Sequence, residues 1–75
     1  MAMIPNYHIN IFYSDDDGGY IADIPDLRHC SAFGGTPEEA LDEVLAAMKL
    51  WVEAAEENNL EIPRARYKPA IYQTG

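Results

Sequence analysis

Several short patterns in this 75-residue chain contain residue types that can do chemistry. The acidic run Asp15, Asp16, Asp17, followed by Gly18 and Gly19, offers the oxygen ligands that Ca²⁺ and Mg²⁺ prefer. An EF-hand loop requires ligands at alternate positions and a closing Glu, and this run has neither. We therefore interpret it as a solvated hairpin loop, in which the Asp-Gly pair supplies a residue that tolerates positive φ.

A second pattern is the pair His29 and Cys30, the residue types of a general base and a nucleophile. Neighbouring residues on a strand point to opposite faces, and no third group that would orient the base is identifiable. We expect Cys30 to be a small buried apolar residue. We expect His29 to be an exposed loop residue or a contact at an interface.

Two carboxylates, Asp23 and Asp26, flank Pro25. Asp26 is better explained as a turn former whose side chain accepts from the backbone amides that follow it. The role of Asp23 stays open. Trp51 has the ring for stacking on bases, but its place on an apolar helix stripe favours a core or subunit contact.

The pair Gly34 and Gly35 precedes a helix start, as phosphate-binding loops do. The pattern has no Lys and is too short for a P-loop, and Glu38 and Glu39 would repel an anion there. We assign the glycines to backbone geometry. The sequence therefore predicts no catalytic, cofactor-binding or metal-binding residue, and we expect a protein that is not an enzyme.

The elements that position these residues follow from hydrophobic periodicity. Residues 7–13 alternate as a strand does, with Tyr7, Ile9, Ile11 and Tyr13 on one side. Residues 20–24 form a second strand that Pro25 ends, and 30–33 form a short third strand closed by glycines. This order predicts an α+β fold, a three-stranded antiparallel sheet with one long helix on one face; a fourth strand at 70–72 stays open.

The helix is expected over 37–58. Thr36 is placed to cap it and Pro37 suits its first turn, while Glu39 is placed to reach back to the Thr36 amide in a capping box. Asn58 and Asn59 provide a left-handed stop. Leu60 and Ile62 are expected to fold back over the helix end. One helix face carries an apolar stripe at three- and four-residue spacing, made of Leu41, Val44, Leu45, Met48, Trp51, Val52 and Ala55.

Length and composition predict one domain over 1–75, with an arm at 1–6 and an extended basic tail at 63–75. The single Cys excludes a multi-cysteine metal site and fits a reducing compartment. No signal sequence opens the chain, and no apolar run approaches the ~20 residues of a membrane span. We expect a soluble cytoplasmic protein.

The charge is distributed unevenly. Positions 1–63 hold all 13 acidic residues against Arg28 and Lys49 and so carry −11, whereas 64–75 carry +3. This acidic body would repel nucleic acid and attract a basic partner, although solubility alone also explains it. The basic tail is suited to clamp an acidic neighbouring subunit. The candidate partner-binding residues are Asp15, Asp16, Asp17, Glu53, Glu56 and Glu57.

A single helix covers only one face of a three-stranded sheet, which leaves side chains such as Phe12 and any outward tyrosines uncovered. A chain of this size also buries only ~60% of the surface that its unfolded form exposes. We therefore expect self-association as a homodimer or a dimer of dimers.

The run 19–41 also resembles the signature of the HicB antitoxin family. It has a Gly-Tyr pair, an Ala-containing strand, Pro-Asp-Leu before a Cys, a Gly before a Thr, and Glu-Glu-Ala-Leu. Similarity continues along the helix and tail. The residues that carry the signature are Gly19, Tyr20, Pro25, Asp26, Leu27, Cys30, Gly34, Thr36, Glu39 and Ala40.

The resemblance implies a partial ribonuclease-H-like βββα(β) fold and a partner, HicA, a small basic toxin that cleaves mRNA. A HicB-like protein masks the toxin without catalysis; the alternative is a stand-alone structural or regulatory homo-oligomer with no toxin partner. Two departures stand out. The common Pro-Gly before the Cys is Arg28-His29 here, and the sequence stops at Gly75 without a DNA-binding segment. We therefore expect a short UPF0150-type member that binds no nucleic acid directly.

Overall fold

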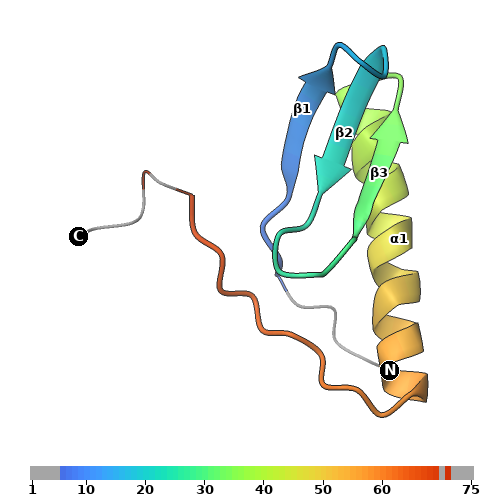
Figure 1. Ribbon diagram of the computed structural model, residues 1–75, viewed down its shortest axis with the longest axis vertical. Coiled ribbons are helices and arrows are strands. Elements are labelled where there is room, and N and C mark those ends of the chain that lie inside the picture. Colours follow the sequence, from blue (N-terminus) through green and yellow to red (C-terminus); the bar gives the residue numbers. More distant parts are fainter. Residues whose placement is uncertain (1–5, 70, 72–75) are drawn as a thin grey trace.

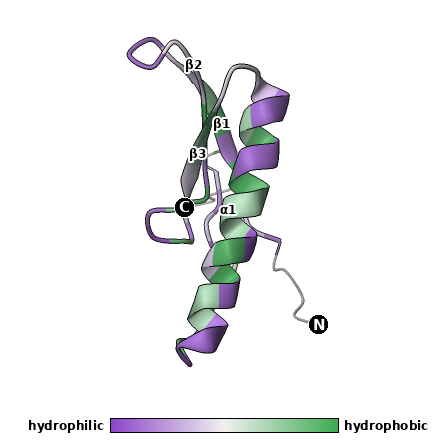
Figure 2. Ribbon diagram, turned by 90° about the vertical axis from the view of Figure 1, so that its right-hand side faces the viewer, coloured by the Kyte–Doolittle hydropathy of each residue, from purple (hydrophilic) through white to green (hydrophobic). Residues whose placement is uncertain are grey.

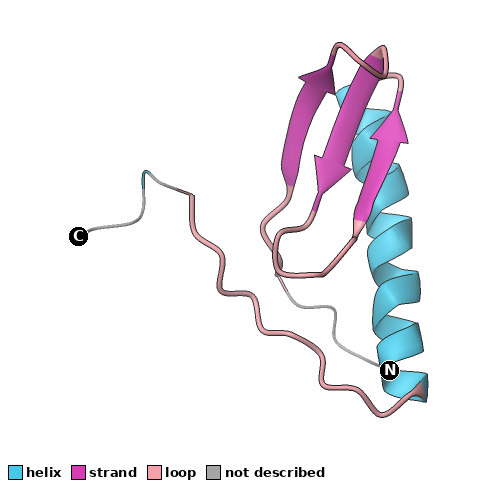
Figure 3. Cartoon of the chain, viewed as in Figure 1, coloured by secondary structure: helices cyan, strands magenta, loops and turns pink. Residues whose placement is uncertain are grey.

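The computed structural model of the protein describes residues 6–69 and 71. Three strands, β1 (Asn10–Ser14), β2 (Gly19–Asp23) and β3 (Ser31–Gly34), precede one helix, α1 (Pro37–Glu57). The strands form one antiparallel sheet in the order β1-β2-β3, and α1 packs against one face of it (Figures 1 and 3). The predicted α+β architecture is therefore confirmed.

The loop between β1 and β2 is the predicted hairpin. Ser14 pairs with Gly19, and Gly18 has a φ of 68° while its amide donates to the Ser14 carbonyl at 2.9 Å. The Ser14 hydroxyl also donates to the Asp17 carboxylate at 2.9 Å. An acidic loop thus closes on local hydrogen bonds and keeps its carboxylates exposed.

The first strand begins later than predicted. We expected it over 7–13, but β1 starts at Asn10, which pairs with the last residue of β2, Asp23. Beyond Asp23 the chain turns at Pro25, which has no amide to donate to a ladder. Residues 7–9 therefore have no pairing partner on β2. Tyr7 is nevertheless buried, in agreement with its predicted place on the same side as Ile9 and Ile11.

The connection from β2 to β3 is a tight loop held by backbone hydrogen bonds. The Ile24 amide donates to the Cys30 carbonyl at 3.0 Å, and the Leu27 amide donates to the Ile24 carbonyl at 3.0 Å. His29 has a φ of 60°, a conformation that glycine adopts at least cost. The Cys30 amide donates within the loop, to the Leu27 carbonyl at 3.4 Å, and β3 begins at Ser31, one residue after the predicted position.

The helix starts where the capping pattern predicts. The Glu39 amide donates to the Thr36 hydroxyl at 3.1 Å. The expected return bond is wrong by one residue, because the Glu39 carboxylate accepts from the Gly35 amide at 2.8 Å and not from Thr36. A Cβ at Gly34 would collide with the backbone nitrogen of Ala40, so glycine allows β3 and α1 to approach closely.

The core lies between α1 and the sheet, and the green stripe along the helix in Figure 2 marks its apolar residues. The predicted stripe is largely confirmed, with two differences. Leu45 is 39% exposed, and Ala40, which we did not include, is fully buried. The buried core residues are Tyr7, Ala22, Ile24, Leu27, Cys30, Ala40, Val44, Met48 and Val52.

The helix ends as predicted at an Asn pair. Asn58 caps α1, and Asn59 has a φ of 56°. Ile62 packs against the core, but the expectation for Leu60 is wrong, because its side chain is 62% exposed. The Leu60 amide donates to the Ala55 carbonyl at 2.8 Å. This bond reverses the chain directly after the helix and leaves the Leu60 side chain in solvent. The open question of a fourth strand at 70–72 lies largely outside the described residues.

Candidate functional site: the outer sheet face and the anchored tail

The face of the sheet opposite α1 carries an apolar row. Strand register places Phe12 opposite Ile21, and Ile21 opposite Phe33, so these side chains share one face. Ala22, next along β2, is fully buried and points to the other face, toward the helix. Phe12 is 51% exposed and Phe33 is 48% exposed. The outer apolar row is therefore Phe12, Ile21 and Phe33, one residue from each strand.

The tyrosines of the hairpin do not belong to the outer face. Tyr13 pairs with Tyr20, and Tyr20 pairs with Gly34, in the set of residues that share the helix side with Ala22. The Tyr13 and Tyr20 rings meet edge to face with centroids 5.3 Å apart. The outer face therefore presents phenylalanine and isoleucine, and no tyrosine from the strands.

Acidic residues flank the outer apolar row along the strand direction. Toward the hairpin, Asp15, Asp16 and Asp17 are exposed a few residues beyond Phe12. Toward the other end, Asp23 shares the outer face with its pairing partners Asn10 and Ser31. A partner that covers the row therefore meets carboxylates at both ends.

The structure separates the two predicted acidic sets. The hairpin set lies at the end of the molecule where α1 begins, while Glu53, Glu56 and Glu57 lie in the last turns of α1, at the opposite end (Figure 1). All six side chains are exposed, as predicted. One compact partner that contacts the outer apolar row is therefore adjacent to the hairpin set and remote from the helix set.

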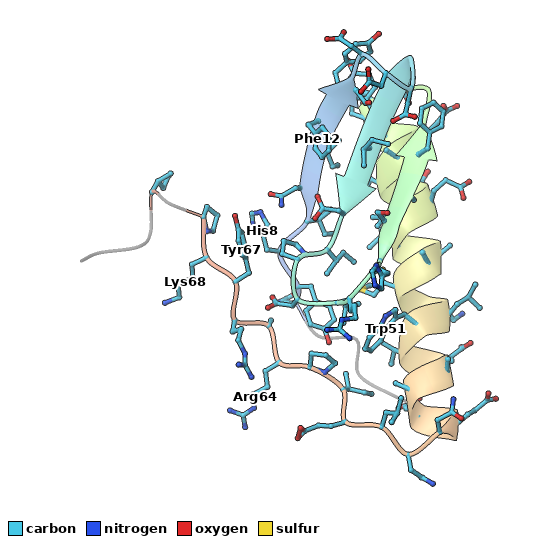
Figure 4. The ribbon with its side chains drawn as sticks, in the orientation of Figure 1. His8, Phe12, Trp51, Arg64, Tyr67 and Lys68 are labelled. Atoms are coloured by element: carbon cyan, nitrogen blue, oxygen red, sulfur yellow. The ribbon has the colours of Figure 1, made fainter. Side chains whose placement is uncertain are left out.

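The tail is anchored to the body by contacts that sequence reasoning missed. The Asp26 carboxylate accepts from the backbone amides of Arg66 and Tyr67 at 3.1 Å each. The Tyr7 hydroxyl donates to the Pro63 carbonyl at 2.6 Å, and the His8 and Tyr67 rings lie 4.8 Å apart (Figure 4). Asp26 lies in the predicted turn, which the Leu27 amide closes on the Ile24 carbonyl. The expectation that its side chain accepts from the amides that follow it is wrong, because the carboxylate accepts from a segment 40 residues away.

Two buried groups titrate abnormally. Burial raises the pKa of the Tyr7 hydroxyl, and the nearby Asp26 carboxylate raises it further. Burial also raises the pKa of the Cys30 thiol, which favours the neutral form and lowers nucleophilicity. His29 is exposed while Cys30 is buried, so the structure does not bring this pair together as base and nucleophile.

Trp51 is half-buried, and its indole Nε1 donates to the Arg28 carbonyl at 3.0 Å. This bond ties the helix to the loop before β3, in agreement with a core contact. Within residues 6–69 and 71, no cluster of His, Cys, Asp and Glu side chains is arranged to hold a metal ion.

The signature residues serve this framework. A Cβ at Gly19 would meet the Phe33 ring at 2.5 Å, so glycine lets that ring cover the hairpin base. Leu27 and Cys30 are core residues, and Ala40 lies against Gly34. Phe33 and Ile21 were not among our candidates; only the strand register, which pairs them with Phe12, would have identified them.

In the part of the chain that the structure describes, α1 is too polar to cross a bilayer, and no other helix has the required length. Comparison with family models gives no match, and no solved structure matches either.

Two proteins of similar length do match. The UPF0150 protein ssl0259 of Synechocystis sp. is 41% identical over 58 residues, which cover 77% of this chain and 78% of that protein. The UPF0150 protein Ta0767 of Thermoplasma acidophilum is 35% identical over 54 residues, covering 72% and 78%. The chain therefore belongs to the UPF0150 family, the HicB-like proteins.

Proposed function

We propose that this protein is a non-catalytic, cytoplasmic binding module that masks a small basic HicA-like toxin. The observation that supports this most is the outer apolar row, Phe12, Ile21 and Phe33, which lies uncovered between carboxylates. Aromatic side chains in an exposed patch contribute strongly to protein interfaces. The row supplies the apolar centre of the contact and the carboxylates supply its rim.

The charge of the body selects a basic partner. Positions 1–63 carry −11, and the hairpin carboxylates of Asp15, Asp16 and Asp17 lie beside the row. Such a field accelerates the encounter with a cationic protein and opposes contact with phosphate backbones. A toxin that binds RNA through a basic surface would present that surface to this face, and its occupation blocks access of RNA.

The test first asks whether the neighbouring gene encodes a small basic protein. Its product is then immobilised, and binding is measured at two salt concentrations. We expect the association rate to fall with salt. Replacing Phe12 and Phe33 together by Ser removes the apolar centre and raises the dissociation rate. Replacing Asp15, Asp16 and Asp17 by Asn slows association.

The matched control neutralises Glu53, Glu56 and Glu57 to Gln, the same change of charge at the remote end of the molecule. We expect this control to slow association less than the hairpin variant does. Tight binding that ignores salt and both acidic variants contradicts the electrostatic part of the proposal. Absence of binding to the neighbouring protein removes the toxin role.

The second candidate is a stand-alone homo-oligomer in which another copy covers the outer apolar row. The same exposed Phe12 and Phe33 support it, because two such rows can pack against each other. Light scattering separates the candidates. If replacing both Phe residues by Ser halves the mass of the assembly and no basic partner binds, the stand-alone role holds.

A further inference from the structure

The anchored tail presents a regular series of basic side chains. Arg64, Arg66 and Lys68 occupy alternate positions of the tail, in a segment without helix or strand. Figure 4 shows Arg64 and Lys68 directed away from the body, whereas Tyr67 lies against His8. Arg64 and Arg66 are exposed and border a shallow hollow of about 370 Å³, which Glu61, Ile62 and Pro63 complete. The hollow has room for an acidic side chain.

The anchoring contacts hold this series away from the exposed face of α1. Asp26, Tyr7 and His8 fix residues 63–67 beside the start of β1 and the loop after β2. The tail leaves the helix end and runs away from α1 across the lower part of the molecule (Figure 1). The carboxylates of its own helix therefore lie on another side, and Glu61 is the carboxylate that borders the hollow of Arg64 and Arg66. Because the two arginines outnumber it, the tail can meet an acidic surface of a second molecule.

The last turns of α1 offer such a surface. Glu53, Glu56 and Glu57 are exposed there, and no basic residue lies in the last turn. The C-terminal end of a helix is the negative end of its dipole, which adds to the charge of these carboxylates and favours a nearby cation. The helix start is the positive end, where the dipole favours acidic side chains instead. Within the described residues, the last turn of α1 therefore holds acidic side chains and no basic one, and Lys49 lies one turn before Glu53.

The spacings also correspond. Residues two apart in an extended segment are separated by about 6.6–6.8 Å. Residues four apart on a helix, such as Glu53 and Glu57, are separated by about 6 Å along its axis. We propose that the tail of one copy binds the end of α1 of a second copy, with Arg64 and Arg66 facing Glu53 and Glu57. The two-fold symmetric dimer then contains this contact twice.

This inference goes beyond the proposed function: it gives self-association an interface other than the outer apolar row, which stays free for a basic partner. A nucleic acid is a poorer occupant of the tail, because the body that carries it repels phosphates. Every copy carries both the basic series and the acidic helix end, so the complementary surface is always present at the concentration of the protein itself.

The test is a charge swap in the full chain, with mass measured by sedimentation. The tail variant replaces Arg64 and Arg66 by Glu, and the helix variant replaces Glu53 and Glu57 by Lys. We expect each variant alone to self-associate about tenfold more weakly or worse, because like charges then face each other. An equal mixture of the two variants recovers the wild-type mass, since both contacts are again between opposite charges.

The matched control for the helix variant replaces Glu38 and Asp42 by Lys, also four residues apart, at the helix start. Because it keeps Arg64, Arg66, Glu53 and Glu57, this control alone should keep the wild-type mass, whereas the helix variant alone should not. A lowered mass for the control, an unchanged mass for the tail variant, or failure of the mixture of tail and helix variants to recover each overturns the proposal. We expect the tail variant to stay folded, because Arg66 bonds Asp26 through its backbone amide, which the side-chain replacement keeps. Circular dichroism of each variant checks this.

The tail variant also separates this inference from the toxin role. It retains the outer apolar row and every acidic residue of the hairpin. If it loses self-association but binds the basic neighbouring protein, both proposals stand. If wild type self-associates through the tail and binds no basic protein, only the toxin role fails.

Discussion

The helix side of the sheet combines small residues with the large Ile11, Tyr13 and Tyr20, whereas the outer side exposes a row of large apolar residues. The face under α1 carries small side chains where the helix crosses, Ala22, Ala32 and Gly34, while the outer face carries Phe12, Ile21 and Phe33. Small residues let the helix backbone approach the sheet closely, and large exposed apolar residues offer area that another molecule can bury. The inner face therefore forms the core with α1, and the outer face leaves its apolar row exposed.

The sharpest comparison uses one residue type on both sides. Ile24 is 1% exposed in the core, whereas Ile21 lies in the outer apolar row. Ile24→Ala should lower the free energy of unfolding by about 2–5 kcal/mol, because it leaves a cavity. Ile21→Ala should cost about 1 kcal/mol or less, through lost cross-strand contacts. Urea unfolding of both variants measures this; equal losses would show that the outer row belongs to the core.

The close approach of helix and sheet is tested at Gly34. Gly34→Ala places a methyl group against the Ala40 backbone and should cost about 1–3 kcal/mol. The matched control is Gly35→Ala, whose Cβ meets only the flexible Glu39 carboxylate at 3.0 Å. We expect a clearly smaller change in urea midpoint for the control. A tolerated Gly34→Ala would mean that the helix does not need this contact.

The helix that covers the inner face depends on its cap. Thr36→Ala removes the acceptor of the Glu39 amide and should lower stability by about 0.5–2 kcal/mol. Thr36→Ser keeps a hydroxyl and serves as the control. Thermal unfolding followed by circular dichroism measures both, and an unchanged alanine variant would contradict the capping role.

The loop before the buried Cys30 contains a residue in an unfavourable backbone conformation. His29 has a φ of 60° at the position where the common family pattern has Gly. His29→Gly should raise stability by about 0.5–1 kcal/mol, since the left-handed cost exceeds the added freedom of the unfolded chain. Arg28→Gly, at a residue without positive φ, should lower stability instead. A destabilised His29→Gly would assign the imidazole a structural role.

The smallest expected effect is the pH dependence of the inner face. Burial raises the pKa of the Cys30 thiol, so at alkaline pH the unfolded chain loses this proton before the folded one does. Stability should therefore fall as pH rises above the ordinary thiol pKa. Cys30→Ala should move the onset of the fall to higher pH, where Tyr7 titrates with the same sign. Urea midpoints across alkaline pH for both proteins provide the measurement.

Local features of this fold were predictable from sequence. The Thr36 cap, the Asp-Gly hairpin and the Asn58-Asn59 stop each depend on groups within a few residues of one another. The observed strand bounds differ from the predicted ones, because the start of β1 depends on where its partner β2 ends. The acidic candidates were exposed as expected, but Ile21 and Phe33 were missed, since alternation within one strand does not show which residues of the next strand share its face.

By itself, the sequence determined the order of elements, the face of the helix that packs and the separation of an acidic body from a basic tail. These follow from periodicity, capping and composition, which are properties of neighbouring residues. Only the tertiary structure decided the outer apolar row and the anchoring of the tail by Asp26. Both join residues far apart in the chain, and such contacts depend on strand register and on how the chain returns after α1.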